Sequence, residues 1–254
     1  MANTVRKFRF IGCEVLYREA CHLAAAGPNA VDVEFLAKGL HDLETADMAA
    51  KIQAVVDATD PAKGYEAILL GYARCNDGLV GVRARDLPLV IPKAHDCITL
   101  LLGSRTAFRA YFDKNPGTYY KSTGWIERDP EEGLDRPAYG ISGVMKNLGL
   151  TETFEELVAK HGRGNAEYII ETLGGWEKAY SRLCYIEMGL CDETPFEARA
   201  RQIAKQHGWT YEQKKGDLGL LRKLFLGEWD EDFVIVPPNQ CIVARNDEEI
   251  LDSR

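Results

Sequence analysis

Three cysteines and two histidines are the residues whose types and spacing could support metal or thiol chemistry. Cys13, Cys75 and Cys97, like His41 and His95, fall in the turns that follow short apolar runs. Thiolate and imidazole groups bind zinc and iron, and a thiolate is also a nucleophile. The three cysteines are far apart in the sequence and form no CxxC motif, so only the fold could bring them together.

The apolar runs before these residues predict the strands of a parallel sheet. Four strands are expected, at residues 7–12, 30–36, 65–72 and 87–91, and the segments between them predict helices. Strands that alternate with helices at this spacing are joined by right-handed crossovers and lie parallel. The carboxyl ends of parallel strands share one edge, where open α/β sheets bind ligands. We therefore expect the three cysteines and both histidines to converge there.

The turn after the fourth expected strand holds the most side chains that could bind a metal or take part in catalysis. Pro92 ends the strand, and Asp96 is expected to cap a helix that starts with residues 98–102. Cys97 would then lie in the first helical turn, where free N–H groups and the helix dipole favour a thiolate. The alternative is a buried structural cysteine beside a cap. Asp42 and Asp96 each follow a histidine and could orient an imidazole.

Two cations lie in the same turns as the cysteines. The charges of Arg74 and Lys93 would suit a carboxylate or phosphate on a small-molecule substrate, and a solvated surface charge is the alternative for each. The glycine-containing turns match neither a GxGxxG sequence nor a Walker loop. A dinucleotide or a nucleoside triphosphate is therefore not expected.

The expected fold is α/β, with two Rossmann-like units whose parallel sheets enclose a cleft. Residues 1–105 form the first unit and carry the Cys/His site. Residues 106–174 are expected as an irregular and helical connection that covers the cleft, with an aromatic loop at 111–125. Residues 175–254 form the second α/β unit. Its strands are expected at residues 182–186, 210–213 and 232–236.

The composition is that of a soluble globular protein. The 254 residues are 46% hydrophobic, and the formal charge of −8 argues against nucleic acid or an anionic membrane as partner. No apolar run approaches the roughly 20 residues that cross a bilayer. The N-terminal residues lack the apolar stretch of a signal peptide, so a cytoplasmic location is expected. In a reducing compartment, seven cysteines favour metal ligation, catalysis or burial over disulfides.

Several longer motifs extend the pattern. They are GLHD at 39–42, LGYARCNDGLVG at 70–81, VIPKAHDCITLLLGS at 90–104, GTYY and TGWIER within 117–128, and FVIVPP at 233–238. Over nearly the whole chain these motifs resemble the family called domain of unknown function 1638. Ala73-Arg74 replaces a more familiar Gly-Leu pair, which alters the pocket beside the cysteine. Family members often accompany corrinoid-dependent methyltransferases that demethylate methylamines and betaines. The resemblance thus implies a role in corrinoid-linked one-carbon metabolism, with a corrinoid protein or a methyltransferase as partner.

The leading hypothesis is a metal or iron–sulfur site held by the three cysteines. With zinc, the fourth position would be taken by a histidine in a closed site, or by water or a substrate thiol in a catalytic one. With a [4Fe–4S] cluster, three irons would bind cysteine and the fourth would bind substrate as a Lewis acid. The cluster is favoured, because loops can spread around a bulky cofactor. His41, His95 and Asp96 would then be free for acid–base catalysis.

Two other hypotheses stay open. In a metal-free enzyme, Cys97 would be a nucleophile or methyl acceptor activated by its helix N-terminus and by His95. In a non-catalytic accessory protein, the two units would clasp a corrinoid, a corrinoid protein or a metal cofactor. The cobalamin-binding signature Asp-x-His-x-x-Gly is absent, which disfavours direct lower-ligand binding. The leading hypothesis predicts an enzyme of the metal-dependent lyase or methyl-transfer class.

Overall fold

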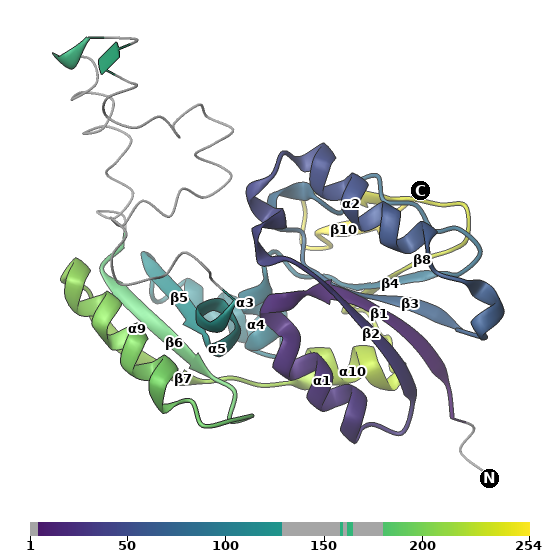
Figure 1. The fold of residues 1–254 in the computed structure, drawn as a ribbon, viewed down its shortest axis with the longest axis horizontal. Coiled ribbons are helices and arrows are strands. Elements are labelled where there is room, and N and C mark those ends of the chain that lie inside the picture. Colours follow the sequence, from purple (N-terminus) through teal and green to yellow (C-terminus); the bar gives the residue numbers. More distant parts are fainter. Residues whose placement is uncertain (1–4, 129–157, 160–161, 165–179) are drawn as a thin grey trace.

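The computed structural model describes residues 5–128, 158–159, 162–164 and 180–254, which form an α/β fold with two sheets of mainly parallel strands (Figure 1). The described strands are β1 (Lys7–Cys13), β2 (Ala30–Leu36), β3 (Ala67–Gly71), β4 (Leu89–Pro92), β5 (Thr118–Ser122), β6 (Arg182–Glu187), β7 (Thr210–Lys215), β8 (Phe233–Val236), β9 (Ile242–Ala244) and β10 (Leu251–Ser253). The described helices are α1 (Tyr17–Ala26), α2 (Thr45–Asp57), α3 (Cys97–Leu101), α4 (Arg105–Phe112), α5 (Thr123–Glu127), α9 (Thr194–His207) and α10 (Gly219–Leu226), with 3-10 turns η1 (Glu14–Leu16), η2 (Lys38–Asp42), η3 (Pro61–Lys63) and η4 (Cys75–Asp77).

The first sheet has the strand order β2-β1-β3-β4-β8, and its first four strands run parallel as predicted. Gly12 pairs with Gly71 near the carboxyl ends of β1 and β3. The ring of Phe10 covers both glycines, and a Cβ on either would lie within 2.5 Å of a ring carbon. The two glycines therefore allow β1 and β3 to end side by side at the same edge.

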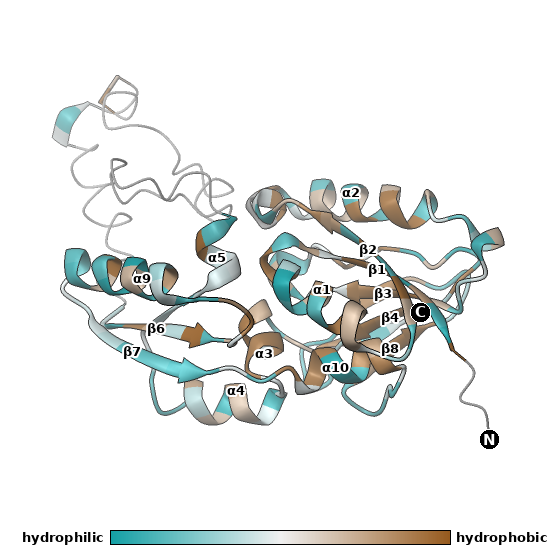
Figure 2. Cartoon of the chain, turned by 60° about the horizontal axis from the view of Figure 1, so that its bottom comes forward, coloured by the Kyte–Doolittle hydropathy of each residue, from teal (hydrophilic) through white to brown (hydrophobic). Residues whose placement is uncertain are grey.

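Helices cover both faces of this sheet. Figure 2 shows its apolar strands between α2 on one side and α1 with α10 on the other. On the α1 side, Phe8, Phe10 and Leu69 are fully buried, and on the α2 side so is Ile11. Burial of each such side chain contributes roughly 1.5–3 kcal/mol. Coverage on two faces explains why the run at β3 is continuously apolar rather than alternating.

The strand β8 and the helix α10 lie on the first sheet, although the sequence placed both in the second unit. β8 pairs antiparallel with β4, with Val90 opposite Ile235, and α10 packs against α1, β3 and β4. The chain therefore leaves the first sheet after β4 and returns to it after β7. An apolar run shows that a strand exists but does not identify the strand with which it pairs.

The second sheet has the order β5-β6-β7, and all three strands run parallel. Leu183, Tyr185 and Trp209 form its core with apolar residues of α9. The aromatic segment 111–125 was predicted as an irregular loop, yet it contains β5 and the start of α5. The helices expected between residues 141 and 173 lie almost entirely outside the described residues. In the described part of the chain, no helix has both the length and the apolar character needed to span a membrane.

Candidate functional site

The carboxyl edge of the first sheet brings together Cys13, Cys75 and Cys97. Cys13 is the last residue of β1, Cys75 opens η4 after β3, and Cys97 is the first residue of α3 after β4. A negative charge on Cys75 would raise the pKa of Cys97, and a charge on Cys13 would raise the pKa of both. The three thiols therefore lie within electrostatic range of one another, at the edge where the parallel strands end.

The environment of the three thiols keeps them protonated at neutral pH. Burial raises the pKa of Cys13 to about 11 and that of Cys75 to about 12, and it raises the pKa of Cys97 well above its usual value. The nearby Asp96 carboxylate adds to the shift of Cys75 and Cys97. The sequence predicted a thiolate at Cys97 because of the helix dipole, but α3 has only 5 residues and burial outweighs that dipole.

Backbone hydrogen bonds hold the turns after β3 and β4 together. The Arg74 N–H donates to the Ala94 carbonyl at 2.8 Å, and the Cys75 N–H donates to the His95 carbonyl at 3.1 Å. The Cys75 sulfur in turn accepts a hydrogen bond from the backbone N–H of Cys97. Two cysteines that are remote in sequence are thus fixed by direct contacts between their own turns.

The η4 turn has an unusual backbone. Asn76 and Asp77 have φ values of 41° and 57°, in the left-handed region, which is uncommon outside glycine and which Asn and Asp adopt more readily than other residues. The Asn76 side-chain amide donates to the Leu43 carbonyl at 3.0 Å, and Thr45 Oγ1 donates to the Asn76 carbonyl at 2.9 Å. Strained conformations of this kind cluster at functional sites and persist where neighbouring contacts impose them.

The helix α5 from the second-sheet region covers the thiols. The Trp125 side chain lies close enough to Cys97 to oppose the rise of the Cys97 pKa, and Lys38 Nζ lies 5.0 Å from the centroid of the Trp125 ring. This approach requires glycine at position 124, because a Cβ there would lie 1.8 Å from the carbonyl oxygen of Val15 in η1. The thiols are therefore covered by α5, which approaches η1 closely at Gly124.

Sequence reasoning missed Lys38, Trp125 and Tyr72 at this site. The charge of Lys38 acts on Cys13, so Arg74 and Lys93 are not the only cations near the cysteines. Lys38 and Tyr72 follow the ends of β2 and β3, and the rule that identified the cysteines could have found them. Trp125 comes from another sheet, and no local pattern indicates its position.

Asp96 caps α3 as predicted. Its Oδ1 accepts hydrogen bonds from the Thr99 N–H at 3.0 Å and from Thr99 Oγ1 at 3.1 Å. Burial raises the pKa of this carboxyl, and the bonds to Thr99 oppose the shift. The geometry gives Asp96 a structural contact in addition to the catalytic role that the sequence suggested.

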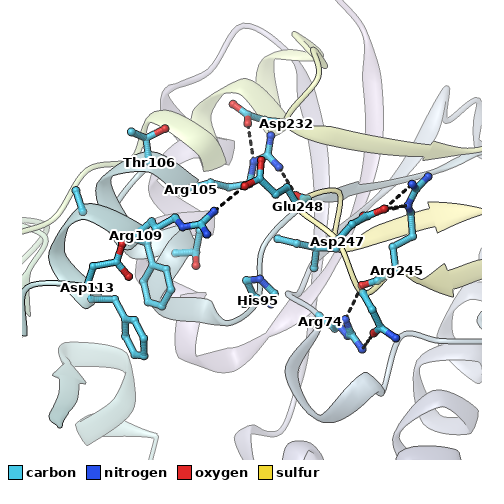
Figure 3. Close-up of a pocket in the computed structure, with 16 residues that line it drawn as sticks. Arg74, His95, Arg105, Thr106, Arg109, Asp113, Asp232, Arg245, Asp247 and Glu248 are labelled. Carbon is cyan, nitrogen blue, oxygen red and sulfur yellow. Dashed lines mark hydrogen bonds and ion pairs between the residues drawn. The ribbon is translucent and has the colours of Figure 1, made fainter. Parts of the chain in front are cut away.

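His95 faces a different space from the cysteines. Its exposed side chain lines an open pocket of about 1030 Å³, between Arg109 and Arg74 (Figure 3). Arg105, Arg245 and the rings of Phe108 and Phe112 also line this pocket. His41 lies in η2 after β2, and the side chains of His41 and Asp42 are outside what the structure describes.

The two cations expected to bind substrate are already in ion pairs. Arg74 lines the pocket, but its Nε donates to Asp77 at 2.5 Å and its Nη1 donates to the Arg245 carbonyl at 2.7 Å. Lys93 pairs with Glu249 and does not line the pocket. The bond from Arg74 to Arg245 and the ion pair of Lys93 with Glu249 connect the sheet edge to the C-terminal segment around the β9–β10 hairpin.

The spacing of the thiols bears on which metal they could bind. Three thiolates on one zinc ion would have sulfur atoms about 3.8 Å apart, given a Zn–S distance of about 2.3 Å. Among the described residues, no three Cys, His, Asp or Glu side chains already form a group that could hold a metal ion. Zinc would therefore require the loops to draw together. A [4Fe–4S] cluster would bind each cysteine to a different iron.

Comparisons with known proteins give one match. The family described as protein of unknown function DUF1638 matches residues 35–225. Neither the curated proteins nor the solved structures gave any match. The matched range includes Cys75, Cys97 and Trp125, and it begins after Cys13.

Proposed function

Because the chain belongs to the DUF1638 family of proteins of unknown function, we propose its function from the site itself: Cys13, Cys75 and Cys97 hold a [4Fe–4S] cluster. The observation that carries this proposal is the parallel register of β1, β3 and β4, which ends the three strands at one edge with the thiols in mutual electrostatic range. We further propose an enzyme of the lyase or methyl-transfer class in corrinoid-linked one-carbon metabolism. That part rests on the resemblance, because family members often accompany corrinoid-dependent methyltransferases.

The chemistry of the three thiols favours a cationic occupant. Each thiolate would raise the pKa of its neighbours, so ionisation of all three is costly unless a metal offsets the charge. Lys38 supplies one fixed positive charge nearby. A bound cluster would provide an iron without a cysteine ligand, which can act as a Lewis acid on a substrate oxygen.

The residues around the thiols and the pocket suggest a division of tasks. Trp125 covers Cys97 and excludes water, which strengthens electrostatic interactions at the thiols. On the other side of the same turn, His95 is accessible to a substrate in the pocket and can exchange a proton with it. Arg105 and Arg109 add positive charge to that pocket, which suits an anionic group.

The metal-free alternative has less support. A nucleophilic cysteine reacts as its thiolate, and burial raises the pKa of Cys97 well above its usual value. The alternative also gives no role to Cys13 and Cys75. A non-catalytic corrinoid accessory protein remains an alternative that uses the same pocket and cysteines.

Anaerobic purification tests the cofactor. We expect about four iron and four sulfide per chain, with broad visible absorbance that bleaches on reduction. A colourless protein with one zinc per chain would instead identify the cofactor as zinc, bound by the same three cysteines. Protein that is free of both metals after anaerobic purification and after reconstitution would overturn the metal site. A separate titration of free cobalamin, followed by its absorption spectrum, tests direct corrinoid binding.

A further inference from the structure

The helix α4 presents a mixed face of arginine and phenylalanine to the open pocket. Four of its residues follow the helical spacing i, i+3, i+4 and i+7 and line the pocket, namely Arg105, Phe108, Arg109 and Phe112. The rings of Phe108 and Phe112 stack with their centroids 5.6 Å apart, and Phe112 is 49% exposed. Exposed rings beside guanidinium groups suit a ligand that has both an apolar part and an anionic group.

A carboxylate of the chain itself occupies part of this face. Glu248 Oε1 accepts a hydrogen bond from Arg109 Nη1 at 3.0 Å (Figure 3), and the Glu248 carbonyl accepts one from Arg105 at 2.8 Å. Among the described residues, Glu248 is the only partner of the Arg109 guanidinium. The two side chains of this ion pair are 68% and 83% exposed, so the pair contributes little to stability. An incoming carboxylate can therefore replace Glu248 on Arg109.

The other arginines at the pocket are held more firmly. Arg105 Nε donates to Asp232 at 3.0 Å, and these two side chains are only 28% and 25% exposed. Arg245 bonds to two carboxylates, and Arg74 Nη1 donates to the Arg245 carbonyl at 2.7 Å. Arg109 is thus the pocket arginine whose charge a ligand can take over most easily.

The turn that supplies Glu248 has a strained backbone. Ile250 has a φ of 64°, a left-handed value that is an outlier for a β-branched residue. Its side chain is buried in the apolar cluster on the α2 face, and its carbonyl accepts the Arg245 N–H at 2.9 Å. These contacts impose the strained turn and fix it as a wall of the pocket. Strain that surrounding contacts impose in this way clusters at ligand sites.

We propose that the pocket binds a small organic carboxylate that carries an aromatic group. The carboxylate takes the place of Glu248 on Arg109, and the aromatic group packs against Phe112 and Phe108. The inference deepens the function proposed above and rests on it for the ligand being a substrate, because His95 faces the same pocket. The binding itself uses none of the three cysteines, so it can be measured with or without metal.

Titrations with 3-phenylpropionate and with its uncharged amide, followed by NMR, test the ligand class. We expect the carboxylate to bind at least about tenfold more tightly than the amide, because only the carboxylate accepts charge-assisted bonds from Arg109. Equal affinity of the two, or no binding of either, would overturn the proposal. Inorganic phosphate that binds as tightly as 3-phenylpropionate would also overturn it, since the rings would then contribute nothing.

Two substitutions should change the affinity for 3-phenylpropionate in opposite directions. Arg109→Gln should weaken binding by about tenfold, whereas Glu248→Gln should strengthen it by about two- to fivefold, because the internal competitor is lost. Arg201→Gln is the control, since Arg201 pairs with Glu197 on α9 and does not line the pocket. Weaker binding by Glu248→Gln, or an equal loss in the control, would contradict the exchange of carboxylates.

A third variant tests the aromatic contact. Phe112→Ala should weaken the binding of 3-phenylpropionate and leave that of acetate unchanged, because acetate has no ring to pack against α4. An equal loss for both ligands would overturn the aromatic part of the proposal. Metal analysis of the same samples separates the two proposals. Metal-free protein that binds the carboxylate even though reconstitution fails would refute only the cofactor, whereas metal-loaded protein that binds no carboxylate would refute only this inference.

Discussion

His95 and Cys97 lie two residues apart in one turn, but their side chains face different spaces. The His95 side chain lines the open pocket, whereas Cys97 lies against Cys75 and Trp125 beneath α5. Asp96 between them caps α3 through Thr99, which fixes the direction of the turn. The turn therefore separates the open pocket from the covered thiols. It contributes the His95 side chain to the pocket and the Cys97 side chain to the thiols.

His95→Ala should therefore leave the bound metal in place. The imidazole faces the pocket rather than the thiols, so its removal should not alter iron or zinc content. Metal analysis and the visible spectrum of the purified variant check this. Catalysis, once a substrate is found, should fall by about 10²–10⁴-fold if His95 is the acid or base. A variant that loses both metal and colour would identify His95 as a ligand.

Replacement of any one of Cys13, Cys75 and Cys97 by Ser should remove most of the metal. The matched control is Cys241→Ser, because Cys241 is also half-buried but lies beyond β8, beside β9. Metal per chain after reconstitution is the measurement. If the three cysteines were only core residues, each serine would cost about 1–3 kcal/mol and leave the metal content unchanged. Equal metal content in all four variants would refute the shared site.

The position of the cysteines was predictable because it depends on local patterns. Apolar runs before Cys13, Cys75 and Cys97 indicate buried strands, and their spacing implies parallel order, which collects strand ends by geometry alone. The direction of each side chain was not predictable in the same way. His95 and Cys97 share a turn, and only tertiary contacts decide which of them faces the thiols.

The errors in the fold come from non-local pairing. No pattern within residues 233–236 indicates that β8 pairs with β4 rather than with a strand of the second sheet. β5 was hidden because Pro116, Gly117 and Gly124 flank it and are typical of loops. Its aromatic residues Tyr119 and Tyr120 in fact suit a strand that packs against β6.

The thiols should alkylate slowly in the metal-free protein. With pKa values of about 11 for Cys13 and about 12 for Cys75, the thiolate fraction at pH 8 is at least about 100-fold below that of an ordinary cysteine. Iodoacetamide labelling between pH 7 and 10, read by mass spectrometry with Cys241 as the reference, measures this. Rapid labelling of Cys97 at pH 7 would contradict its burial and support the nucleophile hypothesis.

Gly124→Ala should separate α5 from the first sheet. The added Cβ would lie 1.8 Å from the Val15 carbonyl oxygen, and two main chains cannot relax as a side chain does. We expect a loss of about 1–3 kcal/mol in the free energy of unfolding in urea, with faster alkylation of Cys97 as Trp125 withdraws. Gly39→Ala is the control, because a Cβ there meets nothing within 4 Å. Equal stability of both variants would contradict the close approach.

Glu19 should make the stability of the fold depend on pH. This carboxyl is 1% exposed, its Oε2 has no partner among the described residues, and burial raises its pKa to about 7. The charges of Glu193 and Glu127 add to the shift, and Arg18 opposes it. Because the folded-state pKa lies above the unfolded value, the protonated form stabilises the fold fully below about pH 4.5. That stabilisation is lost as the pH rises through about 7.

Glu19→Gln imitates the protonated carboxyl at every pH. The variant should match the wild type near pH 5 and exceed its unfolding free energy by up to about 3 kcal/mol at pH 8, since one pKa unit corresponds to about 1.4 kcal/mol. Urea unfolding at a series of pH values measures the difference, with the exposed Glu228→Gln as the control. A constant difference between pH 5 and pH 8 would show that Glu19 does not titrate in this range. The growing difference is expected because only the wild type must ionise a carboxyl that is enclosed by α1, α5 and the start of α9.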